Sequence, residues 1–327
     1  MFKALVLDQV DKKTTAEVKQ LEISDLPDEE VLVDIAYSSL NYKDGMAVTG
    51  TGKIVRDFPM VPGIDFAGTV SESASERYQP GDEVILTGWS VGERYWGGYS
   101  QKERVKADWL VPMPDGLDAR KAMTIGTAGL TAMLCVMTLE EAGVKPDSGK
   151  VLVTGAAGGV GSIAVLLLSQ LGCQVTAVTG RPDTHEYLRL LGASDFISRE
   201  EMAAAARPLE TQKWAGAVDV VGGDMLARVL AEMDYNGAVA ACGLAGDFKL
   251  STTVMPFILR NVSLRGVDSV MCPPERRTVA WERLASELPE EAYSNIGKII
   301  SLEEVVSAGA DIVAGKVKGR VLVDPNL

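Results

Sequence analysis

Short apolar runs alternate with polar turns in the first part of the chain. Gly, Pro and Asp separate the runs, and apolar and polar positions alternate within several of them, as in half-buried strands. The runs cover residues 3–8, 30–40, 66–73, 82–88 and 98–108. We therefore expect residues 1–123 to form a small, irregular, barrel-like antiparallel domain.

The spacing becomes helical at about residue 124, and a Lys-Pro-Asp-Ser-Gly break follows at 145–149. Beyond the break, Val-rich strands alternate with amphipathic helices. The predicted strands are 150–155, 173–180, 195–198, 217–222, 237–243 and 262–268, and the predicted helices are 159–172, 183–192, 200–206, 224–233 and 274–288. This order is typical of an α/β fold with a doubly wound parallel sheet, over residues 124–268. Residues 269–327 are expected to return to the first domain.

The strongest motif joins a strand, a glycine turn and an apolar helix. Its turn runs Ala-Ala-Gly-Gly-Val-Gly at 156–161, an A-x-G-x-x-G form of the dinucleotide pattern. Gly158 lets the backbone approach a pyrophosphate, Gly161 lets the helix pack on the strand, and the N–H groups at the helix start bind phosphates. The predicted cofactor contacts here are Thr154, Ala157, Gly158, Gly159, Val160 and Gly161.

The next strand ends in Thr179-Gly180-Arg181, where an NAD site would carry Asp or Glu. A hydroxyl donor and a guanidinium instead suit the 2′-phosphate of NADPH, so NADPH is predicted rather than NADH. The alternative for Arg181 is a solvated loop cation. The ends of later strands add candidates to line the nicotinamide: Cys242, Gly243, Leu244, Val267 and Ser269. The alternative is that these are ordinary turn residues.

Composition narrows the class of protein. The chain has 327 residues, 46% of them hydrophobic, and a formal charge of −13, which argues against nucleic-acid or anionic-membrane partners. No run of about 18 apolar residues and no signal-peptide pattern occurs. Four scattered cysteines and the single His185 exclude sites with two histidine ligands and fit a reducing compartment. We expect a soluble, cytoplasmic protein.

Several motifs in a fixed order make the chain resemble the medium-chain dehydrogenase/reductase superfamily: the segment 61–70, the Pro-Gly-Asp-Glu-Val turn at 80–84, Gly-Gly-Tyr at 97–99 and the glycine turn. The resemblance implies a GroES-like catalytic domain built from both chain ends, a central Rossmann domain, and a cleft between them. Segments 39–45, 179–188, 240–246, 256–262 and 266–277 further resemble the acrylyl-CoA reductase family, the AcuI or YhdH/YhfP type. That family implies NADPH-dependent reduction of acryloyl-CoA, or a similar short enoyl-CoA, by a homodimer in acrylate and dimethylsulfoniopropionate catabolism.

Zinc enzymes of the superfamily use Cys and Gly-His-Glu as metal ligands. This chain has Asn41 and Gly63-Ile64-Asp65 at those places and lacks the four-cysteine lobe. The resemblance therefore favours the metal-free, quinone-oxidoreductase-like branch.

The resemblance also puts Asn41, Tyr42 and Asp44 in the cleft as candidate catalytic residues, with Tyr42 a candidate cofactor contact and proton donor. A packed tyrosine with solvent as the proton source is the alternative, and Asp44 either orients its neighbours or caps a helix. Lys318 lies in a segment resembling one near the cofactor.

Candidate anchors for CoA are Arg56, Arg94, Arg260, Arg276 and Arg277, with Trp96 or Trp281 for the adenine. The alternative for the Arg276-Arg277 pair is a solvated helix face. Two other functions remain open: a quinone or enone reductase without CoA specificity, and a non-catalytic NADPH-binding protein.

Overall fold

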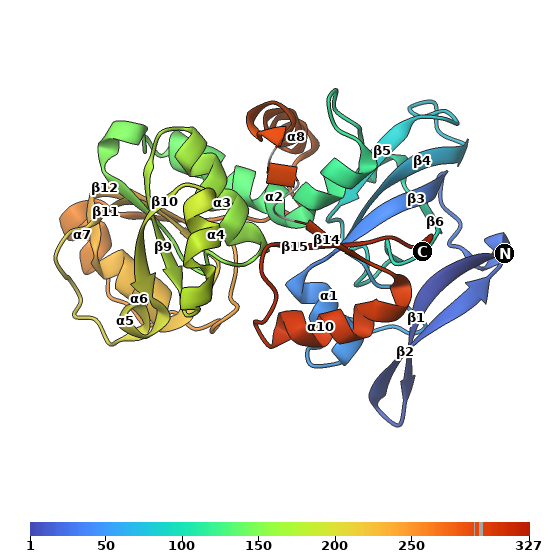
Figure 1. Cartoon of the computed structure of the whole chain (residues 1–327), viewed down its shortest axis with the longest axis horizontal. Helices are drawn as coiled ribbons and strands as arrows, with labels where there is room; N and C mark the ends of the chain where they lie inside the picture. The colour runs from blue at the N-terminus through green and yellow to red at the C-terminus, as the bar shows by residue number, and fades with distance from the viewer. Residues whose placement is uncertain (291, 294–296) are drawn as a thin grey trace. The chain divides into compact units, whose positions relative to one another are not determined.

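The computed structural model describes residues 1–290, 292–293 and 297–327, and the chain divides into two compact units (Figure 1). Unit 1 comprises Met1–Thr127 and Ser269–Leu327, and unit 2 comprises Ala128–Asp268. Both chain ends therefore belong to unit 1.

Unit 1 is built on a seven-stranded sheet in which β14, β15, β3, β4, β5 and β7 follow one another and β6 pairs with β3. All pairs are antiparallel except β14 with β15. Val33 and Ile35 on β3 pack with Phe66 and Leu86 in a buried core, as the alternating pattern predicts. The strands are β3 (Val31–Leu40), β4 (Asp65–Ser73), β5 (Glu83–Thr87), β6 (Lys102–Val105), β7 (Leu110–Pro112), β14 (Gly297–Ile300) and β15 (Arg320–Val323).

The C-terminal segments complete this unit. β15 pairs with β3, placing Val321 opposite Leu40. Helix α10 (Val305–Val313) packs on α1 (Tyr42–Thr49) (Figure 1), where a Cβ on Gly45 would lie 2.8 Å from the Gly309 carbonyl oxygen. Helix α8 (Pro274–Glu287) also belongs to unit 1.

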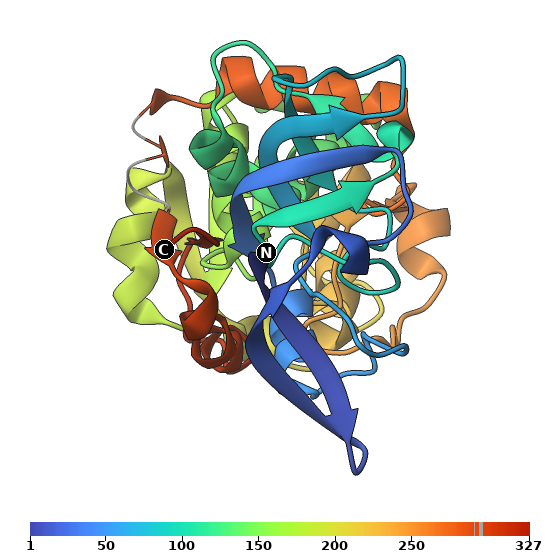
Figure 2. The same cartoon turned by 90° about the vertical axis from the view of Figure 1, so that its right-hand side faces the viewer.

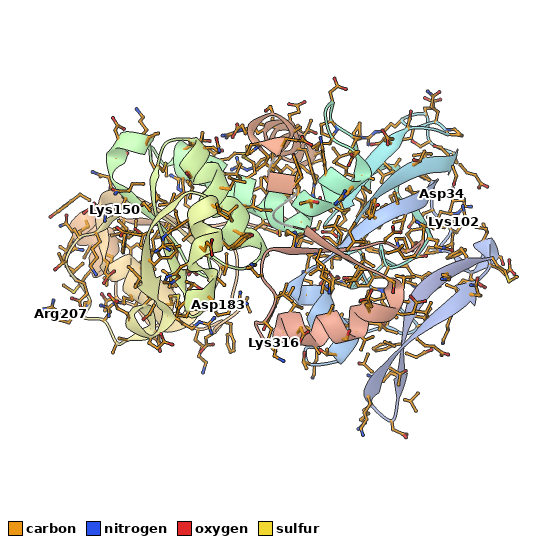
Figure 3. The ribbon with its side chains drawn as sticks, viewed as in Figure 1. Asp34, Lys102, Lys150, Asp183, Arg207 and Lys316 are labelled. Carbon is orange, nitrogen blue, oxygen red and sulfur yellow. The ribbon has the colours of Figure 1, made fainter. Side chains whose placement is uncertain are left out.

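A hairpin of β1 (Phe2–Val10) and β2 (Lys13–Leu21) extends away from the rest of unit 1 (Figure 2). Its turn residues Asp11 and Lys12 both have positive φ, the backbone of a two-residue hairpin turn. Strand β2 was not predicted, because most of its residues are polar. Elsewhere on unit 1, Lys102 of β6 forms an ion pair with Asp34 of β3 (Figure 3).

Unit 2 contains a six-stranded sheet in the order β10-β9-β8-β11-β12-β13, with every pair parallel. This confirms the predicted α/β class. The strands are β8 (Lys150–Val153), β9 (Gln174–Thr179), β10 (Ala193–Ser198), β11 (Trp214–Asp219), β12 (Met233–Ala241) and β13 (Ser263–Gly266). The helices are α3 (Gly159–Gln170), α4 (His185–Leu190), α5 (Arg199–Ala203), α6 (Gly223–Ala231) and α7 (Met255–Arg260), the last of which the sequence analysis did not identify.

Helix α2 (Ala119–Glu141) begins in unit 1 and ends in unit 2, with a kink at Gly126, where φ is 54° and ψ is −162°. Among the described residues, α2 alone is long and apolar enough to cross a membrane by length and composition, although no such run was expected. The apolar stretch of α2 is fully buried inside the protein, as in the core helix of a globular domain.

Candidate functional site

The glycine turn of unit 2 leads from β8 into α3. A Cβ on Gly161 would lie 2.4 Å from the Gly155 carbonyl oxygen and 2.7 Å from the Ala156 Cα, so only glycine fits there. Gly158 is the N-cap of α3, and neither a side-chain cap nor an acidic first-turn residue accompanies it. The start of α3 therefore presents backbone N–H groups suited to an anion.

The strand order places this turn at a reversal point of the sheet. β8 lies between β9 and β11, as in the 3-2-1-4-5-6 order of dinucleotide-binding sheets. Because all six strands are parallel, their carboxyl ends meet at one edge. The structure thereby brings the candidate segments 154–161, 179–181, 242–244 and Val267 to neighbouring strand ends.

Thr154 joins two of these strand ends. Its hydroxyl donates to Asp219 Oδ1 at 2.6 Å and accepts from the Val220 N–H at 3.1 Å, while Asp219 Oδ2 accepts from the Gly222 N–H. Burial raises the pKa of Asp219, and these hydrogen bonds oppose the rise. The side chain of Thr154 is fully buried, so its hydrogen bonds hold the carboxyl ends of β8 and β11 together within the protein.

Two threonines fix the backbone of Arg181. The Thr179 hydroxyl accepts from the Arg181 N–H at 3.2 Å, and the Thr184 hydroxyl donates to the Arg181 carbonyl oxygen at 2.6 Å. The two hydroxyls also share a hydrogen bond of 3.1 Å. Asp183, in the 3₁₀ turn Pro182–Thr184, is exposed (Figure 3). The tip of β9 is therefore a fixed turn.

Arg199, which the sequence analysis missed, lies at the same tip. It is the first residue of α5 and follows Ser198 of β10, which pairs with Thr179. A Cβ on Gly180 would lie 3.1 Å from Arg199 Nε and 3.4 Å from its Cζ, so the guanidinium lies against Gly180. The signal was present: Arg199 directly follows the predicted strand 195–198.

The candidate catalytic residues lie at the start of α1 in unit 1. Asn41 is the N-cap, and Tyr42, the first helical residue, is 38% exposed. Asp44 is buried and accepts from the Asn41 N–H at 2.9 Å and the Ile64 N–H at 3.0 Å. Burial, together with the Asp65 carboxylate, raises the pKa of Asp44 to about 7 against these hydrogen bonds. Asp44 thus fixes the first turn of α1 to residue 64.

The Asn41 side chain faces into unit 1. Its Nδ2 donates to Asp65 Oδ2 at 3.0 Å, and its Oδ1 accepts from Arg320 Nη1 at 3.2 Å. Both ends of the amide are therefore occupied within the protein. The remaining cofactor candidates of unit 1 are Ser269, which is partly buried, and Lys318, which is exposed in the loop before β15.

Two of the predicted CoA anchors and one predicted stacking residue for the adenine are wrong, because their side chains are buried. Arg277 donates to the Thr87 and Ser269 carbonyl oxygens, and Arg260 donates to the Ala231 and Glu210 carbonyl oxygens. Trp281 is fully buried, which removes it as a stacking surface. Arg56 and Arg94 are exposed and remain candidates.

Comparison with known proteins finds two family models, the alcohol dehydrogenase GroES-like domain over residues 27–115 and the zinc-binding dehydrogenase over 159–286. The chain is 61% identical to the probable acrylyl-CoA reductase AcuI of Escherichia coli, over 99% of this chain and all of the relative. It is 56% identical to the acrylyl-CoA reductase AcuI of Ruegeria pomeroyi over the whole of both chains. The crystal structure of Escherichia coli YhdH with bound NADPH matches with a TM-score of 0.97, covering 99% of this chain and all of that one at 61% identity.

The residues at the zinc-ligand positions do not fit a zinc ion. Ile64 has no donor atom in its side chain, and the Asp65 carboxylate already accepts hydrogen bonds from Ser39, Asn41 and the Thr127 N–H. The Arg320 guanidinium lies within the same set of side chains. Across the described part of the chain, no group of three or more His, Cys, Asp or Glu side chains is placed to hold a metal.

Proposed function

The chain belongs to the acrylyl-CoA reductase family of the medium-chain dehydrogenase/reductase superfamily, and on that premise we propose that it reduces acryloyl-CoA, or a similar short enoyl-CoA, with NADPH. The product of acryloyl-CoA is propionyl-CoA. The observation that carries the proposal within this chain is the tip of β9, where the Arg199 guanidinium lies against Gly180 and Arg181 follows in the sequence.

The residues of unit 2 fit NADPH. The backbone N–H groups at 158–161 hold the pyrophosphate at the start of α3. Arg181 and Arg199 hold the 2′-phosphate through charge-assisted hydrogen bonds, which a neutral hydroxyl of NADH cannot use as strongly. When bound, NADPH supplies the hydride that the β-carbon of the enoyl thioester receives.

Negative charge then develops on the thioester oxygen, and the protein has to stabilise it until a proton from the solvent adds to the α-carbon and completes the product. We assign that task to the exposed Tyr42 hydroxyl, with Asn41 and Asp44 fixing the turn that presents it. A positioned donor to such an oxygen contributes about 3–4 kcal/mol, or roughly 10²–10³ in rate. Tyr42→Phe should lower kcat by that order and leave the Kd for NADPH unchanged, whereas wild-type rates at every pH would remove the hydroxyl from the mechanism.

The decisive measurement is steady-state oxidation of NADPH with acryloyl-CoA, crotonyl-CoA, free acrylate and a quinone in parallel. A preference for acryloyl-CoA over free acrylate supports the proposal. Turnover of the quinone without regard to CoA makes the chain a quinone or enone reductase, and NADPH binding without any turnover makes it a non-catalytic binding protein.

We also propose that the protein acts as a homodimer through unit 2. β13 is the last strand of its sheet, so one edge of its backbone is open to pairing. The segment before it exposes large apolar side chains that a second copy would bury: Leu244, Phe248, Val254, Ile258 and Leu259. Sedimentation should give a dimer that Ile258→Glu weakens, and a monomeric wild type would contradict this.

A cytoplasmic location agrees with the reducing environment that four scattered cysteines without a disulfide framework favour. A role in acrylate and dimethylsulfoniopropionate catabolism rests on the family resemblance. Growth of a deletion strain on acrylate tests it, because a strain that clears acrylate normally would contradict that role.

A further inference from the structure

A buried ionic cluster lies beneath the start of α1, formed by Ser39, Asn41, Asp65 and Arg320, and is called here the Asp65–Arg320 cluster. Arg320 is 2% exposed, and Asp65 is fully buried. Arg320 Nη2 donates to Ser39 Oγ at 2.6 Å, and that hydroxyl lies 2.7 Å and 2.8 Å from the two Asp65 carboxylate oxygens. The serine hydroxyl thus bridges the two charged groups.

The cluster is saturated with partners. Asp65 also accepts from the Ser39 N–H at 3.0 Å, the Asn41 amide at 3.0 Å and the Thr127 N–H at 2.8 Å. Arg320 also donates to the Asn41 amide oxygen and, through Nε, to the Thr124 carbonyl oxygen at 3.2 Å. Charges this deeply buried are stable only when paired and hydrogen-bonded, so loss of either one leaves the other uncompensated.

The kink of α2 makes room for the cluster. A Cβ on Gly126 would lie 2.5 Å from Arg320 Nη2, 2.7 Å from Ser39 Oγ and 3.0 Å from Asp65 Oδ2, and the backbone there has positive φ. On this kinked backbone, any other side chain at position 126 would therefore collide with the cluster. The sequence has glycine between Thr124 and Thr127, whose backbone groups bind Arg320 and Asp65.

The cluster reaches the proposed donor through one residue. Asn41 is held at both ends of its amide by Asp65 and Arg320, and it is the N-cap of α1, whose first residue is Tyr42. Among these groups only Tyr42 is exposed, since Asn41, Asp65 and Arg320 are all buried. The hydrogen bonds of the ionic pair therefore reach Tyr42 through Asn41 and the backbone that joins the two residues.

We propose that Asp65 and Arg320 are positioning residues for enoyl-CoA reduction, which act through Asn41 to fix the first turn of α1 and the Tyr42 hydroxyl upon it. The proposal rests on the proposed function and on the role of Tyr42 in it. It assigns no contact with substrate to either charged residue. Arg320 comes from β15 near the C-terminus, so the positioning depends on a strand distant in sequence from α1.

The test is a double-mutant cycle on kcat with acryloyl-CoA, using Arg320→Lys, Tyr42→Phe and the double variant. Arg320→Lys keeps the charge but not the fork that reaches Ser39, Asn41 and Thr124 together. It should lower kcat by about 10- to 100-fold, because a misplacement of about 1 Å in a reacting group costs up to roughly 10²-fold. In the Tyr42→Phe background the same substitution should lower kcat by less than about twofold, since the group it positions is gone.

Two further variants separate positioning from loss of stability. Leu110→Ala opens a cavity in the core of the same unit, away from the cluster, and should lower Tm while leaving kcat unchanged. Ser39→Ala keeps both charges and removes only the bridging hydroxyl, so it serves if Arg320→Lys does not fold, and it should reproduce the loss of kcat and its dependence on Tyr42. The Kd for NADPH should stay the same throughout.

The proposal is overturned if Arg320→Lys, or Ser39→Ala in its place, lowers kcat by the same factor with and without the Tyr42 hydroxyl. It is equally overturned if the variant leaves kcat at the wild-type value. Failure of the proposed function gives a different result, because the wild-type protein itself would then fail to turn over acryloyl-CoA.

Discussion

Replacing Asp44 with Asn removes a titratable group that the fold buries completely. Burial and the nearby Asp65 carboxylate raise the pKa of Asp44 from 3.8 to about 7. Between those values the folded protein keeps a proton that the unfolded chain has released. The free energy of unfolding therefore falls as pH rises through this range and levels off above it. From about pH 5.5 to about pH 8 the loss is about 2 kcal/mol, at 1.36 kcal/mol for each pKa unit.

The assay compares the Tm of the wild type with that of Asp44→Asn across that pH interval. The interval lies above the pI of about 4.7, so it avoids the association that proteins undergo near zero net charge. A change of about 2 kcal/mol corresponds to roughly 4–8 °C for a domain of this size. The wild-type Tm should fall by that much more than the variant Tm. Asn presents one acceptor where the N–H groups of Asn41 and Ile64 need two, so the variant starts lower at acid pH. Parallel curves would refute the raised pKa.

Four other outcomes are expected. Arg199→Ala should raise the Kd for NADPH by roughly 10- to 100-fold, the contribution of a hydrogen bond to a charged group, and should change the Kd for NADH little in a fluorescence titration. Arg181→Ala should have the same effect. Equal losses of affinity for the two cofactors would rule out a contact with the 2′-phosphate. Gly161→Ala should abolish NADPH binding, because its Cβ would meet the Gly155 oxygen at 2.4 Å; retained affinity would contradict this. Glu103→Gln should raise Tm more at pH 8 than at pH 5.5. Burial raises the pKa of Glu103 well above its usual value, and its Oε2 has no hydrogen-bond partner. An effect on Tm that does not depend on pH would contradict the raised pKa. Incubation with a chelator should leave turnover unchanged, and loss restored by added zinc would refute the metal-free site.

Local sequence rules were sufficient for the dinucleotide turn. The change of period near residue 150, the Val-rich strand and the spacing of Gly158 and Gly161 together specify a strand, a turn and a helix. The close approach of Gly161 to the Gly155 carbonyl oxygen is the physical reason for the third glycine of the motif. Nothing beyond about 20 consecutive residues is needed to make that prediction.

Strand order is not local, so Arg199 follows a predicted strand but its place beside Gly180 could not be predicted from the sequence. Arg199 lies against Gly180, the residue before Arg181, because β10 lies beside β9, an arrangement set by packing of the whole sheet. The unit 1 cluster is harder still to predict, since Arg320 and Asn41 are 279 residues apart.

Burial of charge was equally hard to foresee. Arg277 sits in a charged helical segment that reads as solvated, yet it is 1% exposed. Its partners are carbonyl oxygens at Thr87, Ser269, Val270 and Cys272. Backbone acceptors carry no signature in the sequence, so a structural arginine and a ligand-binding arginine look the same until the fold is known.

Strand β15 belongs to unit 1 but is synthesised after the whole of unit 2. All of unit 2 emerges before the last strand of unit 1, so unit 2 can fold while the sheet of unit 1 still lacks β14 and β15. Until β15 is added to the sheet, Asp65 has no Arg320 beside it, and the edge of β3 at Leu40 is unpaired. Without β15, Asp65 would lie buried without Arg320, and the first turn of α1 would lack the ion pair that we propose positions Tyr42.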